Sequence, residues 1–455
     1  MADKQTRVAV VGAGWAGCTA AVELARAGCK VTLFEAARSL GGRARGVMLR
    51  DVMLDNGQHI MLGAYNETLR LLRHVGIEPK QALLNLPLQM RYAPGAGGMD
   101  FVAPRLPAPL HLLVALLRAK GLAREDKMSL ARFSTSARWM EWRLDTDCSV
   151  SELLDRFDQT ERLVQLMWRP LCLAALNTAP ERASAQVFLS VLKDSLGAGR
   201  AASDMLLPKR DLGSLFPTAA AAYVERHGGV VQLGAKVERI SRQGGGWRID
   251  ASGSALNGER GGDYDAVVLA SAPHSAGALI ADLELDAISV QLAAFSYEPI
   301  TTCYLQYGAG TSLALPFYAL IDDGARGHWG QFVFDRGQLD AAQMGLLAVV
   351  ISASGEAAAL GREALAQAIA VQLAEVFKRP ELAMPEWTEL ITEKRATFAC
   401  TPALARPANA SGLPGLVLAG DYTAGAYPAT LESAVRSGIL AAKGVLHDTG
   451  RNQRR

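Results

Sequence analysis

The sequence has few cysteines, little net charge and no metal-ligand spacing. Its six cysteines form no CxxC pair, which argues against a disulfide framework or a zinc site and is typical of a reducing cytosol. The seven histidines form no i, i+4 pair, so no metal is expected. A net charge of +2 gives no strong field for nucleic acid. These absences predict a cytoplasmic globular protein with neither metal nor nucleic acid as a partner.

Long hydrophobic runs are also missing. The longest apolar stretch, LPAPLHLLVALL at residues 106–117, is shorter than the ~18–20 apolar residues that span a bilayer. A run of this length is either a buried helix or a helix that lies on a membrane surface, and the sequence leaves both open. The second alternative predicts a peripheral contact with the inner membrane, with Arg118 and Lys120 near lipid headgroups. The start, MADKQTRVAVVGAG, leads into a strand and does not resemble a signal peptide.

What is present is an α/β pattern at the start, the middle and the end of the chain. Strands are predicted at 7–11 and 30–35 around a helix, and later in DYDAVVLASAP and GLVLAGD. A helical region (106–200) and further strands (295–307, 328–336 and 346–353) separate them. We therefore expect an α/β fold in which a discontinuous Rossmann-like domain is interrupted by an α+β substrate domain. The expected limits are 1–85, 205–285 and 395–455 for the first domain, and 86–204 and 286–394 for the second.

The first strand leads into VGAGWAG, which has the G-x-G-x-x-G spacing. Gly12 permits a tight turn, Gly14 lets the backbone approach a pyrophosphate, and Gly17 lets the helix pack closely on the strand. Glu35 follows Gly17 by 18 residues, near the ~20-residue offset of an acid that binds a ribose hydroxyl. Because this loop lies between a strand and a helix and has its acid, it predicts dinucleotide binding.

Two further motifs favour the same ligand. In LGGRARG, Gly42 and its neighbour let a loop lie against a ligand, and Arg43 can pair with a pyrophosphate. In LAGDYTAGAYPATLESAVRSG, a strand ends at Gly420 and Asp421, which can accept a hydrogen bond from a ribityl hydroxyl. The helix that begins near Ala429 can direct its N-terminal dipole at a ring that becomes anionic on reduction.

Together these motifs resemble the flavin-dependent amine oxidase and phytoene desaturase superfamily. The resemblance implies FAD, and no motif matches the cysteine tether of the monoamine branch, so we expect the FAD to be non-covalent. It also implies that the backbone of Val237, in KVERI, holds the adenine, and that Gly57, in the Asp-x-Gly of DNGQ, lies near the flavin. The cofactor-binding residues expected are Gly12, Ala13, Gly14, Trp15, Ala16, Gly17, Glu35, Gly42, Arg43, Gly57, Val237, Gly420, Asp421, Thr430 and Leu431.

A narrower group within the superfamily also fits. DNGQHIMLGAY, GQFVFDRG, VVISASG and EKRATFACTP are similar, in this order, to the hydroxysqualene dehydroxylase family. The resemblance implies an enzyme that reductively removes the hydroxyl of hydroxysqualene, a C30 isoprenoid alcohol, to give squalene on the route to hopanoids. A single glycine triplet leaves no second site for NAD(P)H, which favours an external electron donor.

Loss of the hydroxyl as water requires a proton donor close to the flavin. His59 is the first candidate, because histidine carries a transferable proton near neutral pH. A structural histidine bonded to the backbone is the alternative. Gln58, Lys394 and Tyr427 are further catalytic candidates, and Asp55 is expected to shape its turn through Asx-type bonds.

Two other functions remain open from the sequence. One is a desaturase or oxidase of the same superfamily, which would act on a carotenoid precursor or another lipid. The other is a non-catalytic carrier that binds flavin or isoprenoid and passes the lipid to a neighbouring enzyme.

Overall fold

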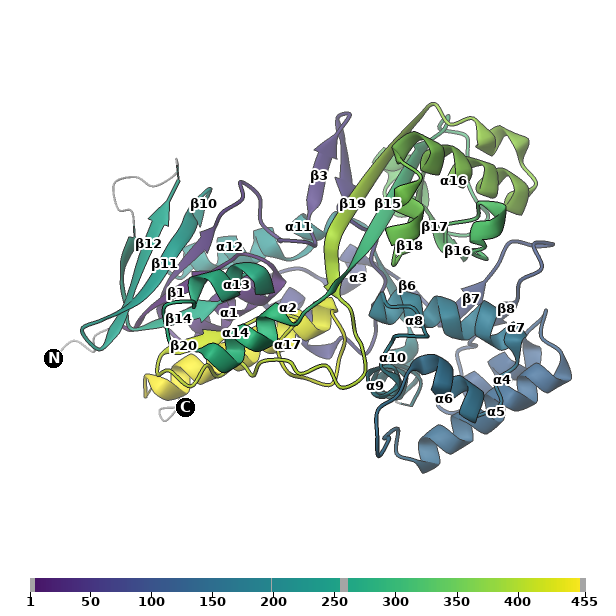
Figure 1. Cartoon of the computed structure of the whole chain (residues 1–455). Coiled ribbons are helices and arrows are strands. Elements are labelled where there is room, and N and C mark those ends of the chain that lie inside the picture. The colour runs from purple at the N-terminus through teal and green to yellow at the C-terminus, as the bar shows by residue number, and fades with distance from the viewer. Residues whose placement is uncertain (1–4, 198, 254–260, 451–455) are drawn as a thin grey trace.

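The computed structural model of the chain describes residues 5–197, 199–253 and 261–450, which form two parts that lie side by side (Figure 1). One part holds a parallel sheet, and both ends of the described chain lie on its side. The other part holds an antiparallel sheet and a group of short helices. Two long strands, β15 (Tyr297–Gln306) and β19 (Trp387–Phe398), run between the two parts.

The parallel sheet has five strands in the order β10-β2-β1-β14-β20. They are β1 (Arg7–Val11), β2 (Lys30–Glu35), β10 (Val230–Leu233), β14 (Ala266–Leu269) and β20 (Leu416–Leu418). Every residue of β14 and β20 is buried, as expected of parallel strands covered on both faces. Because the strands come from three distant stretches of the chain, the predicted α/β class with a discontinuous sheet is confirmed.

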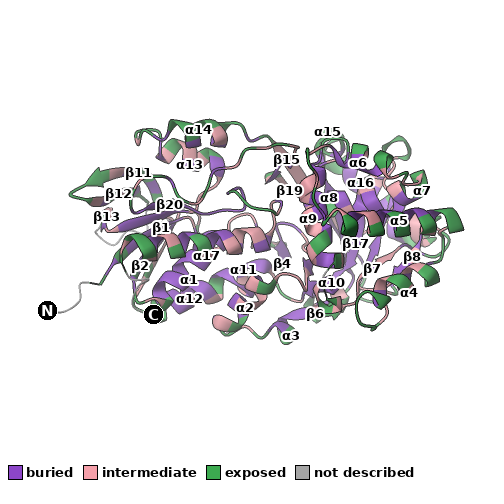
Figure 2. Cartoon of the chain, turned by 90° about the horizontal axis from the view of Figure 1, so that it is seen from below, coloured by how far each residue is buried: buried purple, intermediate pink, exposed green. Residues whose placement is uncertain are grey.

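Helices cover both faces of this sheet (Figure 2). On one face α1 (Trp15–Arg26) packs against α12 (Pro217–Arg226) and α17 (Leu431–Asp448). The opposite face carries an antiparallel three-stranded sheet and two helices. These are β11 (Lys236–Gln243), β12 (Gly246–Ser252), β13 (Gly261–Tyr264), α13 (Pro273–Leu279) and α14 (Asp286–Ala293).

The antiparallel sheet of the second part has the order β16-β17-β18-β15-β19. Its other strands are β16 (Phe317–Ala319), β17 (Phe332–Asp335) and β18 (Leu346–Ser352), and α16 (Arg362–Phe377) packs against β15 and β19. The sequence predicts β15 and β18 closely, places the start of β17 too early at 328, and misses β16 and β19.

Helices dominate the region between residues 110 and 203, as the sequence predicts. They are α4 (Leu110–Arg118), α5 (Arg124–Trp139), α6 (Val150–Arg156), α7 (Glu161–Leu163), α8 (Arg169–Leu176), α9 (Ala185–Leu192) and α10 (Arg200–Ser203). Two segments are π-helical, η1 (Val164–Trp168) and η2 (Lys193–Gly197), a conformation found often at functional sites. Within the described ranges, each helix is too short or too polar to cross a membrane.

Further short elements complete the two parts. They are β3 (Gly46–Leu49), β4 (Val52–Asp55), β5 (Met61–Leu62), β6 (Leu83–Leu86), β7 (Gln89–Arg91), β8 (Asp100–Val102), β9 (Met205–Pro208), α2 (Asn66–His74), α3 (Pro79–Ala82), α11 (Leu212–Leu215) and α15 (Gly355–Ala359). Strand β9 pairs with both β5 and β6. The expected domain limits at 85/86 and 394/395 fall inside β6 and β19, so these limits stay a prediction.

Candidate functional site

The glycine loop joins β1 to α1, and its three glycines have different surroundings. Gly12 has a φ of +104°, and a Cβ there would lie 2.7 Å from the carbonyl oxygen of Ala270. A Cβ on Gly17 would lie 1.8 Å from the carbonyl oxygen of Gly12, so the helix can approach the strand only without a side chain. A Cβ on Gly14 would meet no described atom within 4 Å. The loop is therefore tightly packed at two glycines and open at the third.

The other loop residues serve packing and the backbone. The Trp15 side chain is buried, and its Nε1 donates to the Ala44 carbonyl at 3.2 Å. Ala16 is also buried. The amide of Ala13 donates to Glu35, and its carbonyl accepts from the amide of Gly41 at 2.9 Å. The side chain of Trp15 is thus part of the core, and only its backbone is available to a ligand.

Glu35 ends β2 and holds the glycine loop through its carboxylate. Its Oε2 accepts from the Ala13 amide and its Oε1 from the Ala37 amide, both at 2.8 Å. The Glu35 carbonyl accepts from the Ala235 amide at 2.8 Å, which brings the start of β11 to the end of β2. Val237 follows in β11, and the pairing with β12 shifts between Val237 and Arg239. Such bulges are frequent beside active sites.

The turn after β2 lies directly on the glycine loop. Gly41 and Gly42 have φ values of +104° and +60°, and a Cβ on Gly42 would lie 3.2 Å from the Cα of Gly14. Arg43 follows, and its Nη2 donates to both Asp421 carboxylate oxygens at 2.6 and 2.7 Å. Its Nη1 donates to the Ala396 carbonyl at 2.7 Å. The sequence predicts a pyrophosphate partner for Arg43, whereas here its partner is a carboxylate, so the phosphate contact stays a prediction.

Asp421 lies just after β20, at the entrance to α17. A Cβ on the preceding Gly420 would lie 2.3 Å from the Tyr422 ring, so this turn also requires glycine. Thr430 caps α17, because its Oγ1 accepts from the Ser433 amide at 3.1 Å, and Leu431 begins the helix as a buried residue.

The residues around the glycine loop, the turn after β2 and the turn after β20 fit a polar dinucleotide. The Ser271 amide lies 3.2 Å from where a Gly12 Cβ would be, and the Ser271 Oγ is buried without a described partner. The Tyr422 Oη is also buried without one. Buried hydroxyls are nearly always hydrogen-bonded, so these two, one near Gly12 and one beside Asp421, indicate ligand contacts.

Segment 54–65 is tied to the second part by a network that centres on Gln58. The Gln58 Nε2 donates to the Tyr304 Oη at 2.8 Å, and its Oε1 accepts from the Arg336 Nη1 at 2.9 Å. The Tyr304 Oη donates in turn to the Asp55 carbonyl at 2.8 Å. Tyr304 comes from β15 and Arg336 follows β17 in the GQFVFDRG stretch. The GQFVFDRG stretch is one of the motifs of the family resemblance, but the sequence does not predict that Tyr304 and Arg336 bind Gln58.

The Asp55 carboxylate makes a long-range contact instead of the local Asx bonds expected from the sequence. Its Oδ1 accepts from the Leu212 amide at 2.8 Å, which joins β4 to α11. Burial raises the pKa of Asp55 to about 7, against the opposing effects of this hydrogen bond and of the Arg336 charge.

His59 has the geometry of a neutral histidine. Its Nδ1 lies 2.9 Å from the Gly57 carbonyl, which can only accept, so Nδ1 carries the proton and Nε2 has the free lone pair. Burial lowers the pKa of His59, and the hydrogen bond to Gly57 opposes this only in part. The bond from Nδ1 to the backbone fits the structural alternative, and it also leaves Nε2 free to take up and pass on a proton, so both roles of His59 stay predictions.

The two remaining candidates lie apart from this network. Lys394 is exposed on β19, while its neighbour Glu393 accepts from the Asn56 Nδ2 at 3.2 Å. Because side chains alternate along a strand, Glu393 faces the site and Lys394 faces away. The Tyr427 Oη donates to Asp194 in η2, and its ring lies under the Arg436 guanidinium at 4.9 Å. The sequence does not predict Glu393 as a site residue, although it is the immediate neighbour of the predicted candidate Lys394.

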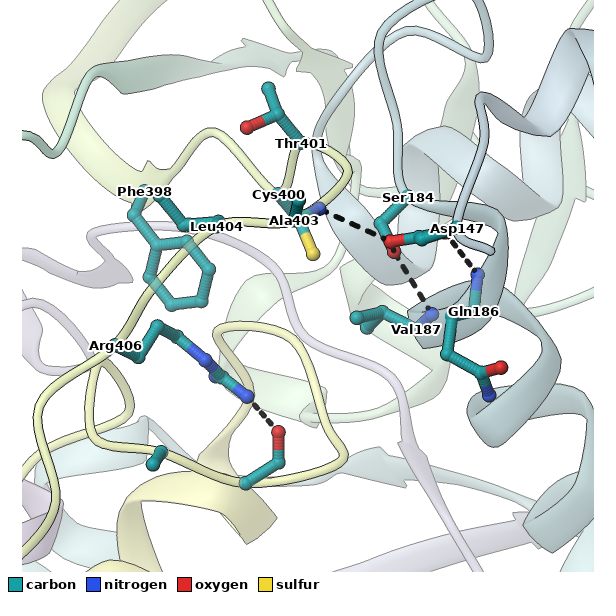
Figure 3. Close-up of a pocket in the computed structure, with 12 residues that line it drawn as sticks. Asp147, Ser184, Gln186, Val187, Phe398, Cys400, Thr401, Ala403, Leu404 and Arg406 are labelled. Atoms are coloured by element: carbon teal, nitrogen blue, oxygen red, sulfur yellow. Dashed lines mark hydrogen bonds between the residues drawn. The ribbon is translucent and has the colours of Figure 1, made fainter. Parts of the chain in front are cut away.

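Of two cavities in the described chain, one adjoins the site region and the other lies in the second part. One, of about 250 Å³, is lined by Asp147, Ser184, Phe398, Cys400 and Arg406, among others (Figure 3). Arg406 donates from Nη1 to the Tyr427 carbonyl at 2.9 Å, so this cavity adjoins the loop before α17. The other, of about 350 Å³, lies between η1 and the second sheet. The described part of the chain holds no group of three or more metal-ligating side chains.

The chain is similar to flavoproteins over nearly its whole length. The profile of the family described as flavin containing amine oxidoreductase matches residues 15–446. Hydroxysqualene dehydroxylase of Rhodopseudomonas palustris is 30% identical, over 96% of this chain and 98% of that protein. Hydroxysqualene dehydroxylase of Sinorhizobium fredii is 28% identical, over 97% of this chain and 99% of that protein.

A similar fold is known from a solved structure. Cyclohexylamine oxidase of Brevibacterium oxydans superposes with a TM-score of 0.67 at 17% identity, over 98% of this chain and 100% of that one. This similarity concerns the fold alone, and it confirms the amine oxidase-like architecture expected from the sequence.

Proposed function

Because this chain belongs to the flavin-containing amine oxidoreductase family and, within it, to the hydroxysqualene dehydroxylases, we propose that it reductively removes the hydroxyl group of hydroxysqualene to give squalene. The chain is an FAD-dependent oxidoreductase, and the substrate is the proposed part. The observation that carries it is the extent of the match, which includes the second sheet and the helices as well as the dinucleotide fold. The substrate part of an enzyme sets its specificity, so similarity there favours a shared substrate. A place on the route to hopanoids is part of this proposal.

We propose non-covalent FAD as the cofactor. The glycine loop and the turn at Gly42 would hold the pyrophosphate, Glu35 the ribose, and the Val237 backbone the adenine. Asp421 and the N-terminus of α17 would hold the ribityl chain and the ring. A thioether link through Cys400 would need a reactive thiol, whereas burial raises the pKa of Cys400 to about 12, which disfavours the thiolate.

The reaction exchanges a C–O bond for a C–H bond and takes up two electrons and two protons, with water as the second product. A bound reduced flavin would supply the hydride. We assign delivery of the proton to Nε2 of His59, which would first take up a proton from solvent while Nδ1–H stays bonded to the Gly57 carbonyl. Tyr304 and Arg336 hold the Gln58 amide from both ends and thereby fix the segment that carries His59. The apolar residues that follow His59 in segment 54–65 would exclude water from the reacting carbon.

The electrons come, in this proposal, from an external donor. The described chain offers one glycine loop of the dinucleotide type, between β1 and α1, and in this proposal FAD would occupy it. A separate reductant must therefore restore the reduced flavin after each turnover.

The test is product analysis under anaerobic conditions. The purified full-length protein, reconstituted with FAD and chemically reduced, is mixed with hydroxysqualene or, in parallel, with phytoene, and products are identified by mass spectrometry. Squalene formed in step with flavin reoxidation supports the proposal. A dehydrogenated polyene formed from phytoene by the oxidised protein would identify a desaturase. A flavin that neither substrate reoxidises or reduces would indicate the carrier.

A further inference from the structure

The outward face of α4 is apolar, although it is exposed. Leu110, Leu113 and Leu117 stand at helical spacing on one side and are 48%, 51% and 66% exposed. Residues 105–109, which precede α4, are all exposed and include Leu106. A solvated helix normally turns charged residues to this side, so the face requires an explanation.

The polarity of α4 is inverted with respect to a water-exposed helix. The buried side carries His111 and Ala115, which are 1% and 0% exposed. His111 is therefore the polar residue of the first two turns, and it points inward, where its Nε2 lies 3.4 Å from the Ser203 Oγ. The outward leucines have the arrangement of a helix whose outer surroundings are apolar.

Positive charge surrounds this face. Residues 105–143 contain eight Lys or Arg and three Asp or Glu, a local net charge of +5 in a chain whose total is +2. Arg105, Arg118, Lys120 and Arg124 are exposed, and none of them pairs with an acid in the described ranges. An apolar face rimmed by unpaired cations is complementary to lipid tails beneath anionic headgroups.

We propose that residues 105–124, the α4 surface, dock on an anionic lipid bilayer. A helix of nine residues would lie in the interface between lipid and water, because ~20 residues are needed to cross the hydrocarbon core of a bilayer. The leucines enter the acyl boundary while Arg118, Lys120 and Arg124 remain among the headgroups. The inference deepens the proposed function by giving a route for a lipid substrate, and it rests on that function only for this purpose.

The α4 surface is also directly connected to segment 54–65. Ser203, the partner of His111, ends α10 and precedes β9. The neighbouring backbone binds the segment: Gly63 donates to the Asp204 carbonyl at 2.8 Å and Ala64 to the Ala202 carbonyl at 3.0 Å. A lipid that entered at α4 would thus be one layer of chain away from the segment of His59.

Co-sedimentation with vesicles tests the docking without any substrate. The full-length protein is mixed with vesicles of phosphatidylcholine alone or of equal parts phosphatidylcholine and phosphatidylglycerol. We expect binding to the anionic vesicles that declines with added salt. Leu110→Gln, Leu113→Gln and Leu117→Gln together should lower the bound-to-free ratio by about tenfold or more. Gln is a good helix former, so the helix should persist.

A matched triple variant controls for general loss of surface hydrophobicity. Val290→Gln, Leu360→Gln and Met384→Gln replace three exposed apolar residues far from α4 in the sequence and should bind like the wild type. Arg118→Gln, Lys120→Gln and Arg124→Gln together should remove the preference for phosphatidylglycerol. Circular dichroism and flavin content confirm that each variant is folded.

Three results would overturn the proposal. They are a wild type that stays in the supernatant with anionic vesicles, a leucine variant that binds as well as the wild type, and a wild-type dimer that the leucine variant converts to a monomer. The last result would identify the α4 surface as a contact between copies of the chain. None of these outcomes bears on the conversion of hydroxysqualene, which is measured separately with detergent-dispersed substrate.

Discussion

The ion pair between Arg43 and Asp421 joins two residues that lie 378 positions apart. It ties the turn after β2 to the end of β20, and both residues belong to segments that we expect to hold FAD. Asp421 is 7% exposed, so loss of Arg43 would leave a carboxylate poorly solvated. The pair thus connects the stability of the chain to the geometry of the cofactor site.

Arg43→Ala and Asp421→Ala should each lower the free energy of unfolding by about 1–3 kcal/mol, because each leaves one partly buried charge without its partner. The double variant should be less destabilised than the sum of the two. Denaturation of all four proteins in urea measures this coupling. Strict additivity would show that the pair contributes nothing beyond its separate residues.

Asp55 should make stability depend on pH. Its folded pKa of about 7 lies above its ordinary value of 3.8, so the native state keeps the proton that the unfolded state has lost. Stability from this group is complete below pH 4 and falls as the pH rises to 7, by a total on the order of 4 kcal/mol. Asp55→Asn mimics the protonated form and should be more stable than the wild type at pH 8 but not at pH 4. Equal pH profiles for both proteins would contradict this.

His59 should affect turnover without affecting flavin binding. Since burial lowers its pKa, a rate that needs the protonated ring should rise as the pH falls below 6.5. His59→Ala should keep its flavin, lose about 100-fold in kcat and lose this acid limb. His59→Gln is the size-matched control and should also lose it. Wild-type kcat in either variant at saturating substrate would assign His59 to a structural role.

At the scale of elements, the loop between β1 and α1 contains one glycine that the fold requires and another that we expect a ligand to require. Gly17 is glycine because the helix packs on the strand, whereas Gly14 has open space in front of it and an ordinary φ of −71°. The chain therefore needs Gly17 for the packing of the helix on the strand, whereas we expect it to need Gly14 for the ligand.

Gly17→Ala should destabilise the chain strongly, since its Cβ would overlap the Gly12 carbonyl oxygen. Gly14→Ala should leave the melting temperature of the flavin-free protein within a few degrees of the wild type, yet lower flavin affinity by about tenfold or more. Thermal melts and flavin titration of both variants measure the contrast. A Gly14→Ala protein that binds flavin normally would remove this loop from the pyrophosphate site.

At the scale of the whole molecule, the proposed cofactor site draws on segments 12–43, 237, 271 and 420–431. Flavin should therefore stabilise the entire fold rather than one end of it. At a free concentration 100 times Kd, binding contributes about 2.7 kcal/mol. Hydrogen exchange should show added protection in β1, β14 and β20 alike. Protection limited to residues 7–35 would contradict a site shared by the distant segments.

The sequence predicts what is local and misses what distant segments build. The glycine loop, Glu35 and the strands around them follow from spacing within some 30 residues, and the structure places them as expected. The roles of Tyr304, Arg336 and Glu393 depend on how β15, β17 and β19 meet segment 54–65. The pattern of hydrophobic residues in the sequence does not show that these strands contact segment 54–65. The sequence predicts a role for Lys394 and none for Glu393, because it does not show that β19 is a strand whose alternate side chains face segment 54–65.

The order of the parallel sheet has a consequence during synthesis. Strand β14 pairs with β1 on one side and with β20 on the other, and β20 begins at Leu416. A nascent chain must therefore be synthesised beyond Leu418 before that edge of β14 is covered. Until then an apolar edge strand is open to pairing with other chains. Chaperone supply during translation, more than the stability of the finished fold, should limit the yield of this protein when it is overproduced.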